Sequence, residues 1–305
     1  MSWVVYTRRA IRIIMTMSVT TRIDQALQAA VAQATQRGCP PRLAEALHYS
    51  LFPGGARVRP RLCLAVAGAS GDDAPQLADA AAAAIELLHC ASLVHDDLPC
   101  FDDSPLRRGK PSVHHAFGER LAVLVGDAMI VLAFQTLARG AAAMPERLVP
   151  LLLTVGDAVG MPRGIAAGQA WECESRVALS DYHNAKTGAL FVAACVAGAQ
   201  AAGADPAPWR RVGECLGEAY QVADDLRDAV CDIDELGKPV QRDAVLGRPS
   251  AVEELGVAGA IQRLRDLVAQ AGASVPPCPG GEELKALIAG EATRILPKEL
   301  VGNAA

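Results

Sequence analysis

One uninterrupted run of alanine and leucine constrains the fold of this chain more than any other feature of its sequence. The run extends from Asp73 to about Leu98, and at 1.5 Å per residue a helix of that length spans roughly 40 Å. Alanine is the strongest helix former, and its small side chain lets neighbouring helices approach closely. A helix that is apolar on most of its faces must be buried, so we expect it to cross the centre of the domain.

The rest of the chain shows the same helical periodicity, with breaks at clusters of glycine and proline. Alternating strand patterns are scarce, and neither GxGxxG nor GxxxxGK[ST] occurs, so a nucleotide-binding α/β sheet has little support. About eight to ten helical segments lie between the breaks. We therefore predict an all-α fold, a single-domain bundle of about ten or more helices over residues 20–298, with an N-terminal tail at 1–19 and a C-terminal tail at 299–305.

Charge and cysteine content narrow the class of protein. A net charge of -5 argues against nucleic acid as a partner. The nine cysteines form no CxxC pair, which is typical of reduced core residues in a cytoplasmic protein. Residues 1–17 contain arginines but no small-residue cleavage site, so they predict a loose tail or an upstream start codon and not a signal peptide. Charges interrupt the apolar stretches, and we expect no transmembrane segment.

Acidic residues gather where the long apolar run ends. Asp96, Asp97, Asp102 and Asp103 lie within eight residues, near the negative end of the helix dipole. Such carboxylates repel one another unless a cation neutralises them or water solvates the helix end. Oxygen ligands without a set of histidines and cysteines suit Mg²⁺, which takes substrate phosphates as further ligands. The cluster therefore predicts a magnesium site, with a solvated helix end as the alternative.

A second acidic cluster follows more than a hundred residues later, also in a helical run. Asp224, Asp225 and Asp228 are spaced so that one face of a helix presents all three carboxylates. One such cluster is a weak signal, because acidic helix faces are common. Two of them facing each other across a cavity would hold several metal ions around a diphosphate and stabilise it as a leaving group.

With these motifs in place, the sequence resembles the trans-isoprenyl diphosphate synthases from about Leu43 to Asp243. The first cluster is similar to that family's first aspartate-rich motif in its DDxxxxD form, followed by LRRG at 106–109, and 224–228 is similar to the second motif. The run LLHCASLVHDDLPC at 87–100 resembles the geranylgeranyl diphosphate synthases of bacterial carotenoid and bacteriochlorophyll pathways. The resemblance implies a helical bundle of the isoprenoid synthase type around a central apolar cavity.

The resemblance also implies roles for individual residues. It makes carboxylates of both motifs the ligands of Mg²⁺, three ions per active site: Asp96, Asp97, Asp102, Asp224, Asp225 and Asp228. It places the allylic diphosphate near Arg107, Lys186, Thr187, Gln221 and Lys238, with both lysines also in catalytic roles. It places isopentenyl diphosphate near Arg59, His89 and Arg108. It further implies a homodimer.

One position departs from the family pattern. The usual GGKRxRP is here GGARVRP at 54–60, so Ala56 replaces a lysine that contacts isopentenyl diphosphate in the family. A charge-assisted contact is worth about 1.5–3 kcal/mol, so we expect weaker isopentenyl affinity unless Arg57 or another cation substitutes. The segment Gly247-Arg248-Pro249-Ser250 also departs from the pattern of the family.

The residues one helical turn before Asp96 bear on product length. Ala91 and Ser92 lie about 6–7 Å from Asp96 toward the N-terminus of the same helix. The resemblance implies that a bulky aromatic residue at these positions is a feature of the family's C15 producers. Two small side chains leave the cavity open, so we expect a C20 product, geranylgeranyl diphosphate. A farnesyl or a longer product, C25 and above, is the alternative.

Other functions share part of this pattern. A non-catalytic partner subunit would explain Ala56 but not the retention of both acidic clusters. A terpene cyclase or a head-to-head condensing enzyme would also ionise a diphosphate, but it does not need the second anion site that Arg107, Arg108, Lys186 and Thr187 suggest. A metal-dependent phosphohydrolase must admit water, which an apolar cavity excludes.

Overall fold

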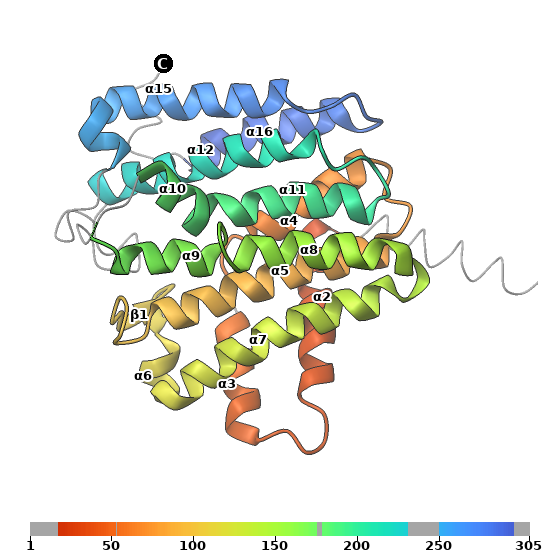
Figure 1. Cartoon of the computed structure of the whole chain (residues 1–305), viewed down its shortest axis with the longest axis vertical. Helices are drawn as coiled ribbons and strands as arrows, with labels where there is room; N and C mark the ends of the chain where they lie inside the picture. Colours follow the sequence, from red (N-terminus) through yellow and green to blue (C-terminus); the bar gives the residue numbers. More distant parts are fainter. Residues whose placement is uncertain (1–17, 53, 176–178, 231–249, 296–305) are drawn as a thin grey trace, which may run out of the picture.

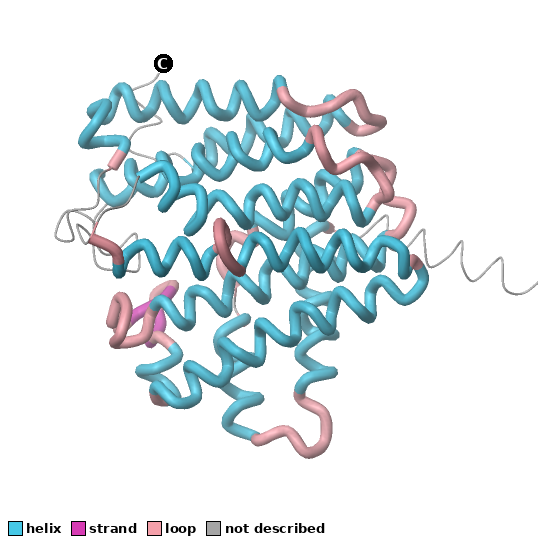
Figure 2. Tube along the Cα trace, viewed as in Figure 1, coloured by secondary structure: helices cyan, strands magenta, loops and turns pink. Residues whose placement is uncertain are grey.

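The computed structural model describes residues 18–52, 54–175, 179–230 and 250–295, and helices dominate these residues (Figure 1, Figure 2). The predicted all-α class is confirmed. The predicted N-terminal tail at 1–19 lies outside the described residues except for residues 18 and 19, and the predicted C-terminal tail at 299–305 lies entirely outside them. The longer helices are α2 (Val19–Ala34), α3 (Pro41–Leu51), α4 (Val58–Ala69), α5 (Pro75–Asp96), α7 (Glu119–Gly140), α8 (Leu148–Val159), α11 (Ala189–Ala201), α12 (Trp209–Val230), α15 (Ala251–Ala273) and α16 (Gly281–Ile295).

Shorter elements connect these helices. They are the strands β1 (Leu106–Arg107) and β2 (Lys110–Pro111), the helices α6 (Val113–Phe117), α9 (Ile165–Ala170) and α10 (Leu179–His183), the 3₁₀ turns η1 (Ala141–Ala143), η2 (Pro145–Arg147) and η3 (Trp171–Cys173), and the π-helical turn η4 (Asn184–Gly188).

The long apolar run forms α5, as the sequence predicts. Pro75 occupies the first helical turn, where a missing N–H is tolerated, and the five alanines at 80–84 are at most 7% exposed. The helix lies in the middle of the stack of helices and packs along α7, α4 and α11 (Figure 1). The prediction of a central, buried helix is confirmed, and its C-terminal end delivers the first acidic cluster.

A tight hairpin follows that end. The strands β1 and β2 pair antiparallel, with Arg107 opposite Lys110, and the two residues between them, Arg108 and Gly109, have φ values of 55° and 74°. Positive φ at both central positions is the geometry of a type I′ turn, which suits the twist of a two-stranded hairpin. The turn therefore fixes the backbone that carries the arginine pair.

A π-helical turn interrupts the helical region before α11. This turn, η4, contacts α9 and α12, and it carries Lys186 and Thr187. Close packing requires glycine next to it, because a Cβ on Gly168 would lie 2.4 Å from the backbone nitrogen of Lys186. Such widened turns are frequently found at functional sites.

Two helices, α5 and α7, are long and apolar enough to cross a membrane by length and composition. For α5 the reason is burial, since 78% of its most apolar window lies inside the bundle. The second candidate segment comprises α7 and η1, and only 39% of its most apolar window is buried, although α7 packs along α5. The apolar residues of α7 therefore divide between the core and an exposed face.

Candidate active site

A cavity of about 810 Å³ lies between the C-terminal ends of α5 and α12. The hairpin residues, α9, η4 and the start of α4 also contribute to its wall. Its lining combines charged groups with apolar side chains from several helices, among them Leu88, Ala91, Ile130, Val159 and Leu190. The expected central cavity is present, but it is not apolar throughout, because both acidic clusters and the basic residues open onto it.

The first acidic cluster divides between the cavity and the protein interior. Asp96 is the last residue of α5, and the backbone N–H of Asp102 donates to its carbonyl at 2.9 Å, which folds the following turn back. The side chains of Asp96 and Asp102 line the cavity. Asp97, whose side chain is 2% exposed, accepts hydrogen bonds from Arg107 instead, with Nε 3.0 Å from Oδ1. Burial raises the pKa of Asp97, and the hydrogen bonds from Arg107 oppose that rise.

Arg107 and Arg108 lie at the same edge of the cavity but differ in their contacts. Arg107 pairs with Asp97 and lies 3.9 Å from Asp96. Arg108 lies so close to the backbone of Gly55 that a Cβ there would be 2.9 Å from its Cζ, and it makes no ion pair with the residues that the structure describes. One arginine is thus fixed by an acid, whereas the other presents its charge to the cavity.

Two of the predicted isopentenyl-side residues, Arg59 and His89, are in contact where α4 begins. Arg59 lies over the rings of Phe191 and Tyr220, at 4.6 and 5.5 Å from their centroids. Its Nη1 is 3.4 Å from Nε2 of His89. Burial, and then the positive charge of Arg59, hold the pKa of His89 well below its usual value, so the ring is neutral and can accept this hydrogen bond.

The remaining arginine of this segment, Arg57, is committed to a buried ion pair. Its side chain is 4% exposed, and it donates to Oε1 of Glu86 at 2.6 Å and to the carbonyl of Leu51 at 2.7 Å. Its charge is therefore balanced by Glu86. The structure places Arg57 on the cavity wall, but this pairing gives no support to its substituting for the lysine missing at Ala56.

A network around Lys186 spans the other side of the cavity. Its Nζ lies 3.5 Å from Oδ1 of Asp96 and donates to Glu172, which also accepts from Tyr182 at 2.6 Å and from Gln169 at 2.9 Å. Burial opposes the charge on Lys186, but Asp96 leads the groups that outweigh it and raise its pKa above the usual value. Gln169, Glu172 and Tyr182 are not among the predicted site residues; their signal in the sequence is the Gln-x-x-Glu spacing at 169–172.

The second acidic cluster lies on one face of α12, as predicted, and all three carboxylates line the cavity. Asp224 pairs with Arg227 at 2.6 Å. Asp225 is 7% exposed and accepts from Gln221 at 3.0 Å and from the backbone N–H of Ala251 at 2.8 Å. Burial raises the pKa of Asp225 against these hydrogen bonds.

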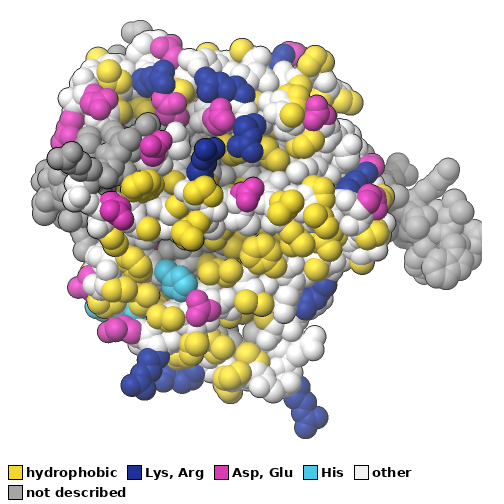
Figure 3. Space-filling view, viewed as in Figure 1, with side chains coloured by type: hydrophobic (Ala, Val, Ile, Leu, Met, Phe, Trp, Pro, Cys, Tyr) yellow, Lys and Arg dark blue, Asp and Glu magenta, His cyan; other side chains and the backbone are white. Residues whose placement is uncertain are grey.

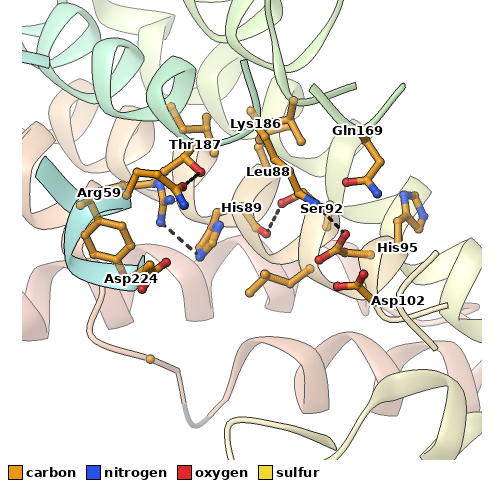
Figure 4. A pocket seen from close by; sticks show the side chains of 18 of the residues that line it. Arg59, Leu88, His89, Ser92, His95, Asp102, Gln169, Lys186, Thr187 and Asp224 are labelled. Atoms are coloured by element: carbon orange, nitrogen blue, oxygen red, sulfur yellow. Dashed lines mark hydrogen bonds and ion pairs between the residues drawn. The ribbon is translucent and has the colours of Figure 1, made fainter. Parts of the chain in front are cut away.

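A hydrogen bond connects this cluster to η4, because Thr187 donates to Gln221 at 2.9 Å. Asp224 and Asp102 lie on opposite sides of the pocket, with His89, Lys186 and Thr187 between them (Figure 4). The predicted pair of facing clusters is therefore present. Lys238 lies outside the described residues, as does most of the altered segment at 247–250.

The two predicted chain-length residues also line the cavity. Ala91 is 1% exposed, and the hydroxyl of Ser92 donates to the carbonyl of His89 at 2.8 Å. The donor set that faces the cavity from both clusters consists of carboxylates alone, which fits a hard cation such as Mg²⁺.

Comparison with known proteins agrees with this geometry. The chain is 54% identical to a geranylgeranyl diphosphate synthase of Cereibacter sphaeroides over 94% of its length and 100% of that protein. It is 50% identical to a geranylgeranyl diphosphate synthase of Rhodobacter capsulatus, over 89% of this chain and 94% of that one.

A solved structure with a similar fold is a geranyltransferase from Helicobacter pylori complexed with magnesium and isoprenyl diphosphate. It has a TM-score of 0.75 and 27% identity, covering 92% of this chain and 99% of that one. Residues 40–274 match the profile of the Polyprenyl synthetase family. With both aspartate-rich motifs opening onto one cavity, the chain belongs to the polyprenyl synthetase family and is a trans-prenyltransferase.

Proposed function

We propose that this protein condenses isopentenyl diphosphate with allylic diphosphates and releases geranylgeranyl diphosphate, the C20 product. The observation that carries the proposal is the pair of acidic clusters on opposite sides of one cavity, with basic residues in two separate groups around it. A cyclase or a phosphohydrolase has no use for two anion sites. The 54% identity to a geranylgeranyl diphosphate synthase over the whole of that protein supports the product.

The residues suited to hold Mg²⁺, with three ions per site, are Asp96 and Asp102 on one side and the three carboxylates of α12 on the other. Bound Mg²⁺ would stabilise the negative charge that develops on the departing diphosphate. Asp97 has a different role in this proposal, because it orients Arg107 toward the same diphosphate. Lys186 adds a fixed positive charge on the allylic side, held in place by Glu172.

The second substrate would bind where Arg59, His89 and Arg108 line the cavity. The aromatic rings beneath Arg59 orient its guanidinium without neutralising it. Cleavage of the allylic C–O bond releases diphosphate and leaves an allylic carbocation. The double bond of isopentenyl diphosphate then attacks this carbocation, and the released diphosphate takes up the proton that is lost to complete the elongation. Apolar side chains such as Leu88 and Leu190 exclude the water that would otherwise capture the cation.

Product length would be set by the small residues on α5. Ala91 and Ser92 lie on the cavity wall below Asp96, where an aromatic ring would shorten the space for the growing chain. Their size supports a C20 product over a C15 one.

We also propose that the protein acts in the cytoplasm as a homodimer and supplies a C20 precursor for carotenoids. An exposed apolar face supports the homodimer: Leu124 and Val131 on α7, and Val149 and Leu153 on α8, are 52–62% exposed. Hydrophobic side chains gather on the surface over these two helices (Figure 3). Exposed apolar patches of this kind commonly mark interfaces between protein chains.

Incubation with Mg²⁺, labelled isopentenyl diphosphate and, separately, C5, C10 and C15 allylic diphosphates tests the function. We expect a C20 product that disappears in Asp96→Ala and Asp224→Ala variants but persists in Asp157→Ala, an exposed aspartate on α8. In Ala91→Phe we expect a shift toward C15. A C15 or a longer product from the unmodified protein would contradict the assignment of product length. No elongation by folded protein would favour a non-catalytic partner subunit.

A further inference from the structure

Three potential metal ligands lie together outside the cavity. Asp103 follows Asp102 in the turn after α5, and His114 and His115 are neighbours in α6. Each contributes one ligand atom, and these atoms lie within 4.8 Å of one another. None of the three side chains lines the substrate cavity, so the group is separate from the carboxylates assigned to Mg²⁺.

His114 provides independent evidence for a ligand. Its side chain is 6% exposed, and its Nδ1 is 3.0 Å from the hydroxyl of Ser112. Its other ring nitrogen, Nε2, is buried and makes no hydrogen bond with the residues that the structure describes. Buried polar atoms in native proteins usually have a partner, so this nitrogen needs one that the side chains around it do not supply. A hydrogen bond at the other ring nitrogen is the usual support for a metal-binding histidine.

The spacing fits a metal better than a direct contact. Nε2 of His114 lies 3.7 Å from Oδ1 of Asp103, which is too long for a hydrogen bond. Two ligands on one tetrahedral ion lie roughly 3.4 Å apart, given bonds near 2.1 Å. His115 completes the set, with its ring centroid 4.5 Å from that of His114.

We propose that Asp103, His114 and His115 bind one borderline divalent transition metal ion, for which Zn²⁺ is the representative. Two imidazoles and one carboxylate suit Zn²⁺, Cu²⁺ or Ni²⁺, whereas Mg²⁺ prefers oxygen ligands alone. Asp103 and His115 are exposed, which leaves room for water as a fourth ligand. The ion would join the turn that carries Asp102 to α6. This inference does not depend on the proposed product.

Titration of the full-length protein with Zn²⁺ in saturating Mg²⁺ tests the site by calorimetry, and Co²⁺ provides an absorption spectrum of the same site. We expect one tightly bound ion per chain and a rise in melting temperature. The variants Asp103→Asn and His115→Gln should each weaken binding by about tenfold or more and remove the thermal shift. Both residues are exposed, and asparagine tolerates the left-handed backbone at position 103, where φ is 45°, so both variants should fold.

Three control variants separate this site from others. His48→Gln removes an exposed histidine outside the cluster, Asp224→Asn alters the catalytic carboxylates, and Cys100→Ser removes an exposed thiol in the same turn as Asp103. All three should retain Zn²⁺ binding. Absence of binding to the unmodified protein, or equal affinity in Asp103→Asn and His115→Gln, would overturn the proposal. Loss of Zn²⁺ binding in either control variant, Cys100→Ser or Asp224→Asn, would also overturn the proposal, because the ion would then be bound by residues outside the proposed site.

Discussion

The two sides of the cavity hold their positive charges in opposite ways. On the allylic side, Lys186 and Arg107 are paired with carboxylates, Glu172 and Asp97, which fix their positions. On the isopentenyl side, Arg59 rests on aromatic rings and a neutral histidine, and among the described residues it forms no ion pair. A cation supported by neutral groups keeps its full charge for an incoming anion, whereas one paired with an acid gains precise orientation at the expense of net charge.

The isopentenyl side is also the one that has lost a charge. Ala56 is exposed at the cavity, and the neighbouring Arg57 forms an ion pair with Glu86. The remaining cations there, Arg59 and Arg108, must therefore hold the second diphosphate. The two sides should consequently respond differently to the gain or loss of a single charge.

The largest difference is expected from Lys186→Ala. One charge-assisted contact contributes about 1.5–3 kcal/mol, so the KM for the allylic substrate should rise by about 10–150-fold. The KM for isopentenyl diphosphate should change little, because Lys186 lies on the other side of the cavity. Steady-state kinetics with each substrate varied in turn measures both values.

A matched control for that variant is Lys285→Ala, which removes a half-exposed lysine on α16, far along the chain from the cavity residues. Its kinetics should match those of the unmodified protein. Equal rises in both KM values for Lys186→Ala would show that the allylic and isopentenyl sides of the cavity do not bind their substrates separately.

Much of this arrangement follows from helical spacing and could be predicted from sequence. A long helix that is apolar on most of its faces must be buried, and α5 is central for that reason. The three aspartates of α12 share a face because residues three and four apart lie on the same side of a helix. Both predictions depend on local geometry alone.

Contacts between elements could not be predicted in the same way. The pairing of Arg57 with Glu86 depends on how the start of α4 meets α5, and the contact of Lys186 with Glu172 depends on how η3 and η4 pack. The different environments of Asp96 and Asp97 arise from the turn that follows α5, which brings Arg107 to only one of them as a close partner. No local pattern in the sequence encodes these distances.

A smaller change is expected when the missing charge is restored. In Ala56→Lys, the KM for isopentenyl diphosphate should fall by up to about tenfold, because position 56 is exposed and water screens part of the gain. The KM for the allylic substrate should stay the same. Ala56→Gln is the matched control, since it adds length and polarity without charge. If both variants lower the KM for isopentenyl diphosphate equally, the gain comes from the longer side chain and not from its charge.

The smallest effect concerns stability and tests whether the support beneath Arg59 is neutral. The pKa of His89 is held well below its usual value in the folded protein, so the unfolded chain binds a proton at this residue at a higher pH than the folded one does. The free energy of unfolding should therefore fall as the pH drops below about 6.5, by at most about 1.4 kcal/mol per pH unit. Urea denaturation of the unmodified protein and of His89→Gln between pH 7 and pH 5 measures this, with pH values chosen around the ordinary histidine pKa. The variant should show the shallower dependence, because glutamine takes up no proton. Parallel curves would mean that His89 is protonated in the folded state and that Arg59 is held by some group other than a neutral ring.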